Sequence, residues 1–270
     1  HNWTFTDQSI PLNDCRLGTF AMTYVTSEDH LYIGVYLPFN NRYFEISTVN
    51  ATASVPTVEI WDGTDWETCV DVVDYTDSSG VSLAKSGYIT WSVDEDKQNW
   101  GRVTDPRDEE TAFGLTVPIY DFYWARISWN ASFSATIDYL GYRFCNDDQL
   151  YSLYPDFDNQ ILRDRWEQGS VAGTKTDWKE QQFIASENII RDIKQAKISV
   201  SPNQILDFEL FEEMAIHQTA FLIFAGMGSS HRDDAERAQN RYSQDRNISK
   251  FNTDQNRSGN LKTFGKHMSR

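Results

Sequence analysis

The chain has 270 residues, a formal net charge of −16 and a pI of about 4.6. This charge excludes nucleic-acid binding over the whole surface, because a protein that grips phosphates needs an excess of Lys and Arg on at least one face. The length exceeds the usual size of a single domain, so we expect two cores of ordinary size.

Residues 1–147 are predicted to form a tryptophan-rich antiparallel β-sandwich. Short β-branched and aromatic runs recur there at the spacing typical of a sandwich or barrel. The runs are LGTFAMTYV, HLYIGVYLP, RYFEIST, PTVEIW, ETCVDVV, GYITWS, YWARISW and SATIDYLGYRF. In YWARISW, every second residue from Tyr123 to Trp129 lies on one face of the expected strand, and Arg126 lies on the other.

Three dipeptides that end in glycine separate some of these runs: Asp62–Gly63, Ser79–Gly80 and Ser86–Gly87. Such dipeptides supply the positive φ that tight hairpins require. We therefore expect a turn at each of them.

Seven of the nine tryptophans lie at or before Trp129. Packing in the core is the ordinary role of such residues, but exposed aromatic rings on a sandwich can stack on sugars or anchor a protein interface. Trp66 and Trp100 stand beside expected turns. We therefore expect these two to be exposed and to be the candidate aromatic contacts for a ligand.

The three cysteines Cys15, Cys69 and Cys145 are widely spaced and form no CxxC pair. This pattern indicates neither a disulfide framework nor a zinc site. We expect buried free thiols, all in the β module, and one disulfide among the three stays open as an alternative.

After Phe144 the pattern changes. Residues 148–176 are polar at first, contain a proline and are predicted to be a linker. The apolar spacing then moves from two toward 3.6, which predicts a small helical unit over residues 177–247. Its first helix is expected to begin near Asp177, because Asp177 and Glu180 have the spacing of a capping box.

The second expected helix ends at Gly226 and carries apolar residues on most of its circumference, which is typical of a central helix. His217 lies in it and is expected to be a surface or core histidine rather than a metal ligand. A third, more polar helix is expected to run from about Ser230 to about Tyr242.

We expect no catalytic residue, no metal and no cofactor. The five histidines lack the spacings of metal sites and general bases, and no phosphate-binding glycine loop or nucleophile elbow is present. The acidic segment at residues 105–110 is expected to be a solvated loop rather than the carboxylate pair of a glycosidase. No apolar run approaches the roughly 18 residues of a membrane span, so we expect no membrane segment.

Residues 248–270 are expected to form an extended C-terminal arm. From Ser229 to Arg270 there are nine Lys or Arg and five Asp or Glu, a local charge of +4, which leaves −20 on the rest of the chain. This asymmetry is typical of an interaction arm, and the last residues have too little apolar content to fold alone. We expect the arm to order only against a partner.

The β region resembles a known module. Within residues 58–127, the segments EIWDGTDWETCVDVVDYTDSSGVSLAKSGYITWSVDEDKQNW and FYWARI are similar to a β module that recurs in baseplate, fibre and neck proteins of tailed phages. The shared pattern is W-DG-W, then DxT, SG-x-I-x-W and YW-x-RI. The resemblance implies a virion protein that is made in the host cytoplasm.

The helical region resembles the head-to-tail connector, or adaptor, proteins of tailed phages. The similar segments are DWKEQQFIASENIIRDI, FELFEEMAIHQTAFLIFAGM and DDAERAQNRYSQDR. The resemblance implies a homo-oligomeric ring, commonly a dodecamer, beneath the portal protein, with the C-terminal arm docked on the portal. The implied portal contacts are Arg257, Lys262, Phe264, Lys266 and Arg270.

The hypothesis that follows is a structural connector of the phage neck. DNA would pass through its channel without specific recognition, a further neck or tail protein would bind the ring, and the β-sandwich would lie outside it as a docking place for fibres. The alternative is a carbohydrate- or receptor-binding protein of a baseplate or tail fibre. A glycan-cleaving enzyme is a third class, with only the acidic segment in its favour.

Overall fold

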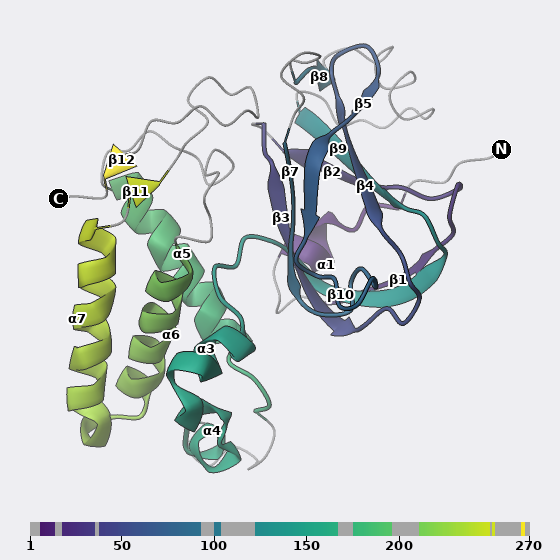
Figure 1. Ribbon diagram of the computed structural model, residues 1–270. Coiled ribbons are helices and arrows are strands. Elements are labelled where there is room, and N and C mark those ends of the chain that lie inside the picture. Colours follow the sequence, from purple (N-terminus) through teal and green to yellow (C-terminus); the bar gives the residue numbers. More distant parts are fainter. Residues whose placement is uncertain are drawn as a thin grey trace. The chain divides into compact units, whose positions relative to one another are not determined.

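The computed structural model divides the chain into two compact units, with the boundary between Gly141 and Tyr142. It describes residues 6–13, 18–35, 38–92, 100–103, 122–166, 175–195, 211–248, 250–251 and 266–267. Antiparallel sheets form the first unit, called here the β module, and helices dominate the second, the helical unit (Figure 1). This arrangement confirms the expected α+β class, a β-sandwich followed by a helical region.

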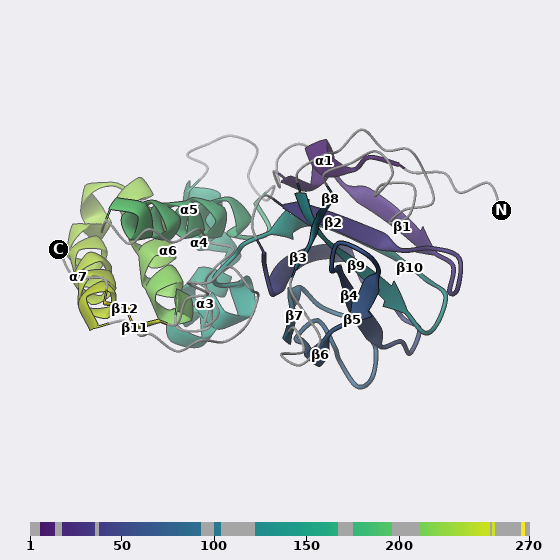
Figure 2. The same cartoon turned by 90° about the horizontal axis from the view of Figure 1, so that it is seen from above.

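Two antiparallel sheets make up the β module (Figure 2). The strands of the first sheet, in spatial order, are β1 (Phe20–Tyr24), β10 (Phe133–Gly141), β3 (Asn41–Thr48), β7 (Gly87–Ser92) and β6 (Val70–Asp74). The second has β2 (Leu31–Val35), β9 (Phe122–Trp129), β4 (Pro56–Trp61) and β5 (Trp66–Thr68), with β8 (Arg102–Val103) also paired to β9. A short helix, α1 (Ser9–Asn13), packs against β10.

The core of the β module lies between the two sheets and joins side chains from both. The alternation expected in β9 is confirmed, because Ala125, Ile127 and Trp129 are buried in this core. Trp129 donates its indole N–H to Ser82 Oγ at 2.9 Å, and the Tyr24 hydroxyl bridges to the Trp129 backbone. The buried indole N–H of Trp129 and the hydroxyl of Tyr24 are therefore both paired in the core.

Two of the three expected turns are left-handed. Gly63 has a φ of +104° between β4 and β5, and Gly80 has a φ of +83°. Gly87 differs, because it begins strand β7 and has no positive φ. A Cβ at Gly87 would lie 2.6 Å from the Tyr75 carbonyl oxygen, so close backbone approach is the reason that glycine is needed there.

The helical unit contains five α-helices and, between them, two 3₁₀ turns in the described part of the chain. They are α3 (Asp147–Leu153), η1 (Pro155–Asp158), α4 (Gln160–Trp166), α5 (Lys179–Gln195), α6 (Glu212–Gly226), η4 (Ser229–His231) and α7 (Arg232–Ile248). None of the described helices has the length and apolar character that a membrane crossing requires.

The expected linker at residues 148–176 is wrong in its described part, which folds into α3, η1 and α4. Asn146 caps α3 in a capping box with Gln149. Leu150 and Phe157 are fully buried, and the Trp178 indole N–H donates to the Phe157 carbonyl at 3.0 Å. Two buried apolar residues anchor this segment to the helical core although most of its surface is polar.

Helix α6 is the central helix, as expected, and packs against both α5 and α7 (Figures 1 and 2). Helix α5 buries one face, which includes Ser186, Ile189, Ile190 and Ile193. The Asp177 carboxylate accepts a hydrogen bond from the Lys179 backbone N–H at 3.2 Å, at the start of α5.

Cys69 and Cys145 are both buried and free. Cys69 lies in the β module, but Cys145 lies in the helical unit, which corrects the expectation that all three thiols share one module. Burial raises the pKa of both thiols, and that of Cys145 reaches about 12. Cys15 lies outside the described residues.

Part of the C-terminal arm is paired. The short strands β11 (Lys250–Phe251) and β12 (Lys266–His267) form an antiparallel pair. Of the five implied portal contacts, Arg257, Lys262, Phe264 and Arg270 lie outside the described residues, and Lys266 is placed only by its backbone.

Candidate functional site

The two tryptophans predicted to be exposed differ in the structure. Trp100 is only 7% exposed and belongs to the core, with its ring 5.1 Å from that of Phe39, so its predicted exposure is wrong. The neighbouring Gly101 donates its N–H to the Trp61 carbonyl at 2.9 Å, which ties the segment to β4. Trp66, in contrast, is only partly buried, at the rim of an aromatic cluster.

This cluster lies on the face of the second sheet that is turned away from the core. We call it the aromatic face, and its members are Tyr32, Trp61, Trp66, Phe122 and Trp124. The Trp66 ring lies 5.7 Å from both the Trp61 ring and the Tyr32 ring. Four neighbouring strands supply these rings, so the sheet itself holds them in place.

A glycine makes room for one of these rings. Gly34 of β2 is paired with Trp124 of β9, and a Cβ at Gly34 would lie 2.7 Å from the Trp124 indole. The indole therefore lies across the neighbouring strand in the space that a side chain would fill.

An ion pair lies beside the Trp66 ring. Arg126 donates from Nε to Glu59 Oε2 at 2.6 Å and from a terminal nitrogen to Oε1 at 2.9 Å, in bidentate geometry. The Arg126 guanidinium also lies 4.7 Å from the centre of the Trp66 ring. The alternation in β9 predicted that Trp124 and Arg126 share a face, but the partner on β4 could not be read from the sequence. The aromatic face therefore offers the planar hydrogen-bonding groups of Arg126 and Glu59 beside the Trp66 ring.

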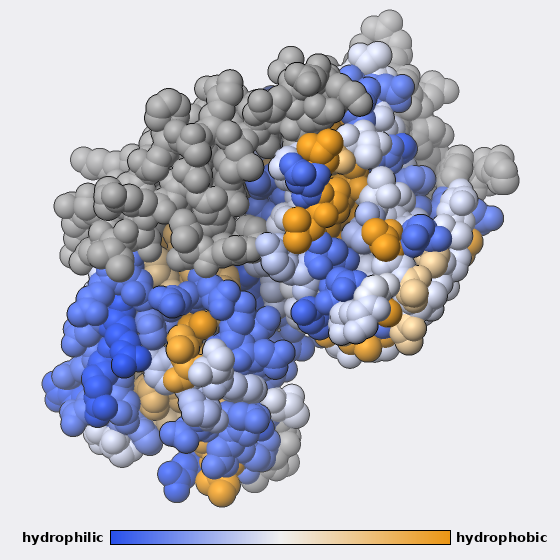
Figure 3. Space-filling view, viewed as in Figure 1, coloured by the Kyte–Doolittle hydropathy of each residue, from blue (hydrophilic) through white to orange (hydrophobic). Residues whose placement is uncertain are grey.

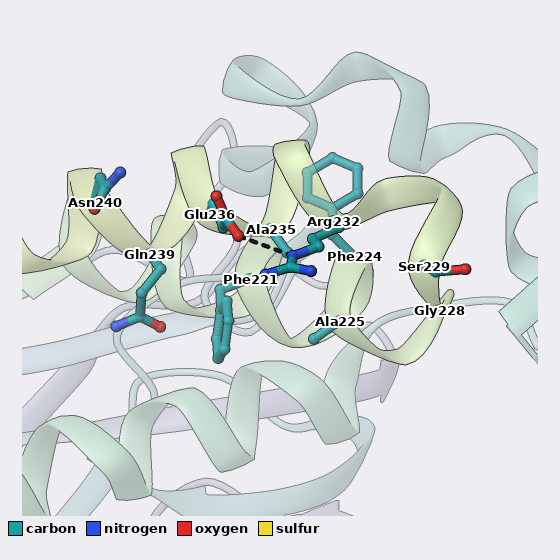
Figure 4. Close-up of a pocket in the computed structure, with 10 residues that line it drawn as sticks. All are labelled: Phe221, Phe224, Ala225, Gly228, Ser229, Arg232, Ala235, Glu236, Gln239 and Asn240. Atoms are coloured by element: carbon teal, nitrogen blue, oxygen red, sulfur yellow. Dashed lines mark hydrogen bonds and ion pairs between the residues drawn. The ribbon is translucent and has the colours of Figure 1, made fainter.

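A second surface feature is a groove between α6 and α7 (Figure 4). Its volume is about 500 Å³, and it opens to solvent. Phe221, Phe224 and Ala225 supply its wall from α6. From α7, Arg232 and Glu236 form an ion pair of 3.0 Å at its rim. The groove was not predicted from the sequence, because it depends on how α6 and α7 pack against each other.

Apolar side chains are also exposed elsewhere. In the β module Val55 is 57% exposed, and Val70 and Val73 on the edge strand β6 are exposed as well. Figure 3 shows apolar patches on the visible face of the β module, and mostly hydrophilic residues on the visible face of the helical unit. Exposed apolar patches of this kind commonly mark interaction surfaces.

His217 is the core histidine that was expected as one of two alternatives. It is 7% exposed, and its Nδ1 lies 2.9 Å from the Tyr154 hydroxyl. Among the described residues, no three or more His, Cys, Asp and Glu side chains gather as metal ligands would.

Comparisons with known proteins gave no match. No family model, no curated protein and no solved structure was found to be similar to the chain. The aromatic face and the α6–α7 groove are therefore the features from which a function can be inferred.

Proposed function

We propose that this protein is a structural connector in the neck of a tailed-phage virion. It would form a homo-oligomeric ring under the portal protein and join the capsid to the tail, and it would act by binding rather than by catalysis. In this proposal the basic C-terminal arm docks on the portal, and the β module lies outside the ring.

The observation that carries the proposal is the α6–α7 groove. An apolar wall with a charged rim is the usual composition of a surface that takes a helix or extended segment of another chain. The helical unit also exposes Leu153 on α3, Ile161 on α4 and Ile184 on α5, on helices that do not line the groove. A groove and separate exposed apolar residues on one unit fit a head-to-tail contact between copies, which closes into a ring if the rotation allows.

Filling the groove should abolish assembly. Ala225 lines the groove and is exposed, so Ala225→Arg should place a long charged side chain there without disturbing the core. We expect wild-type protein to sediment as a ring-sized species and to give rings in electron micrographs, and the variant to remain monomeric with an unchanged circular dichroism spectrum.

Ala51→Arg is the matched control, because it is the same substitution at an exposed alanine of the β module, which the proposal puts outside the ring. It should assemble as the wild type does. Wild-type protein that stays monomeric at every concentration would contradict the ring, and rings formed by Ala225→Arg would contradict the role of the groove.

The second candidate function is binding of a carbohydrate or receptor by a baseplate or tail-fibre protein. The aromatic face favours it, since indole rims beside a bidentate Arg–Glu pair can both stack on a sugar and hydrogen-bond to its hydroxyls. Trp66 is the partly exposed indole of this face, and Arg126 lies directly beside it.

Trp66→Ala should then lower glycan binding at least tenfold on an array of bacterial surface polysaccharides, because it removes the stacking platform. The control is Tyr75→Ala, which removes an exposed aromatic ring from the turn after β6, a strand of the other sheet. Binding that survives Trp66→Ala, or that Tyr75→Ala removes equally, would count against the aromatic face as the ligand site.

A further inference from the structure

A chain of polar side chains crosses the interior of the helical unit. The Tyr154 hydroxyl lies 2.9 Å from His217 Nδ1, and His217 Nε2 lies 3.6 Å from Asp245 Oδ2. Tyr154 lies between α3 and η1, His217 in α6 and Asp245 in α7. This array, named here the Tyr154–His217–Asp245 array, therefore links three parts of the unit that are far apart in the sequence.

The array fits a neutral imidazole. With the Asp245 carboxyl next to Nε2, the proton belongs on Nε2, and Nδ1 is then free to accept the hydrogen bond from the Tyr154 hydroxyl. A protonated ring carries hydrogen on both nitrogens, so Nδ1 can no longer accept that bond. Protonation would also place a charge on a side chain that is only 7% exposed.

The surroundings of His217 lower its pKa on balance. Burial, and next the Arg241 guanidinium of α7, lower the pKa of His217, whereas Glu213 on α6 itself acts in the opposite direction. The pKa of Asp245 is raised, first by burial and then by Glu213. Although Asp245 lies within 4 Å of the ring, the folded unit thus holds His217 in its neutral form.

Charged groups on the other helices and turns packed against α6 have partners of their own. Asp192 of α5 accepts hydrogen bonds from Tyr242 and Arg246, His231 of η4 pairs with Asp234, and Asp147 of α3 accepts from Gln182. His217 and Asp245 are therefore the groups of this array whose protonation is expected to change with pH.

The array is also connected to the groove. The Tyr154 ring stacks on Phe157 at 5.4 Å and meets the edge of Phe224 at 6.2 Å. Phe224 lines the α6–α7 groove, where Figure 4 shows its ring beside α6. Movement of Tyr154 would therefore change the packing behind one wall of the groove.

We infer that the Tyr154–His217–Asp245 array is an acid-responsive clasp, in which protonation of His217 releases the α3–η1 segment from α6 and loosens the wall of the groove. The clasp does not depend on what the groove binds. It rests on the geometry of the array and on the burial of its histidine.

The pKa shifts of His217 and Asp245 determine how the stability of the clasp changes with pH. When the clasp is open, His217 takes up its proton near pH 6.5, whereas in the closed clasp the buried ring does so only at lower pH. The closed clasp therefore loses stability as the pH falls below 6.5. Asp245 has the opposite effect. Its pKa in the closed clasp is raised above the ordinary value of 3.8, so between these two pH values its protonation stabilises the closed clasp. The closed clasp therefore begins to lose stability near pH 6.5. Asp245 offsets part of this loss in the pH range where its carboxyl becomes protonated.

Hydrogen exchange of the full chain tests the clasp. Peptides that cover residues 147–166 are followed by mass spectrometry between about pH 7.5 and about pH 5.5, with correction for the intrinsic exchange rate. The opening constant of the wild type should rise by up to about tenfold for each pH unit below 6.5, until the pKa of the buried ring is reached. His217→Gln keeps a polar side chain that cannot take up a proton, so its opening constant should not rise as the pH falls.

His231→Gln is the matched control, because it removes a second histidine of the same unit, and it should respond to pH as the wild type does. Tyr154→Phe removes the hydroxyl that favours the neutral ring, so the pKa of His217 in the closed clasp should rise toward 6.5 and the opening constant should increase less on acidification than in the wild type. The imidazole C–H signals of the wild type give an independent readout. A His217 signal that titrates at or above pH 6.5, or a His217→Gln protein that opens with acid as the wild type does, would overturn the clasp.

Discussion

Replacing Trp178 with alanine should unfold the helical unit while the β module stays folded. The Trp178 side chain is fully buried, packs against Phe157 and Trp166, and donates its indole N–H to the Phe157 carbonyl. Removing it leaves a large cavity and takes a donor from a buried carbonyl, at a cost of about 3–5 kcal/mol. The helical signal at 222 nm should therefore be lost at much lower denaturant.

Ile161→Ala is the control for this experiment. Ile161 is 64% exposed on α4, in the segment that Trp178 anchors, so its truncation should change the free energy of unfolding by less than about 0.5 kcal/mol. If Trp178→Ala unfolds at the wild-type denaturant concentration, Trp178 is not part of the core that the structure places around it.

Trp129→Ala should have the reciprocal effect and destabilise the β module alone. The Trp129 ring contacts Tyr24 and Phe133, and its indole N–H donates to Ser82 between the two sheets. The loss should again be about 3–5 kcal/mol. Unfolding followed by tryptophan fluorescence, which reports mainly on the β module, should shift to lower denaturant while the signal at 222 nm keeps its transition.

Val55→Ala provides the matched small change in the same module, because Val55 is 57% exposed. It should leave both transitions within about 0.5 kcal/mol of the wild type. A single transition that moves with either tryptophan variant would instead mean that the two units unfold together, contrary to their division at Gly141 and Tyr142.

The linker shows why part of the helical unit could not be predicted. Leu150 and Phe157 are apolar, but Pro155 lies between them and the stretch forms only short helices, so it has no long helical period. They are buried by Trp178 and by α6, which lie well beyond any local window of sequence. The same holds for Trp100, whose burial depends on Phe39 and Tyr123 rather than on the turn beside it.

The candidate surfaces were predictable to different degrees. Alternation along β9 correctly placed Trp124 and Arg126 on the face away from the core, but Glu59, the partner of Arg126, comes from another strand. For the groove, the apolar character of α6 was visible, yet the approach of Arg232 and Glu236 to Phe221 depends on how α7 packs. The connector function itself remains a proposal to be tested on the groove.

Trp66 shows what the local sequence determines and what depends on tertiary packing. The amino-acid sequence alone was sufficient to predict the strands, the central helix and the position of this indole beside a hairpin turn. Periodicity and turn chemistry depend on only a few neighbouring residues. Packing of the whole core determined that Trp66 stays partly exposed while Trp100 is buried, and that Tyr154, His217 and Asp245 meet in one array. Contacts between residues far apart in the chain depend on the fit of many side chains at once, and no local pattern contains that fit.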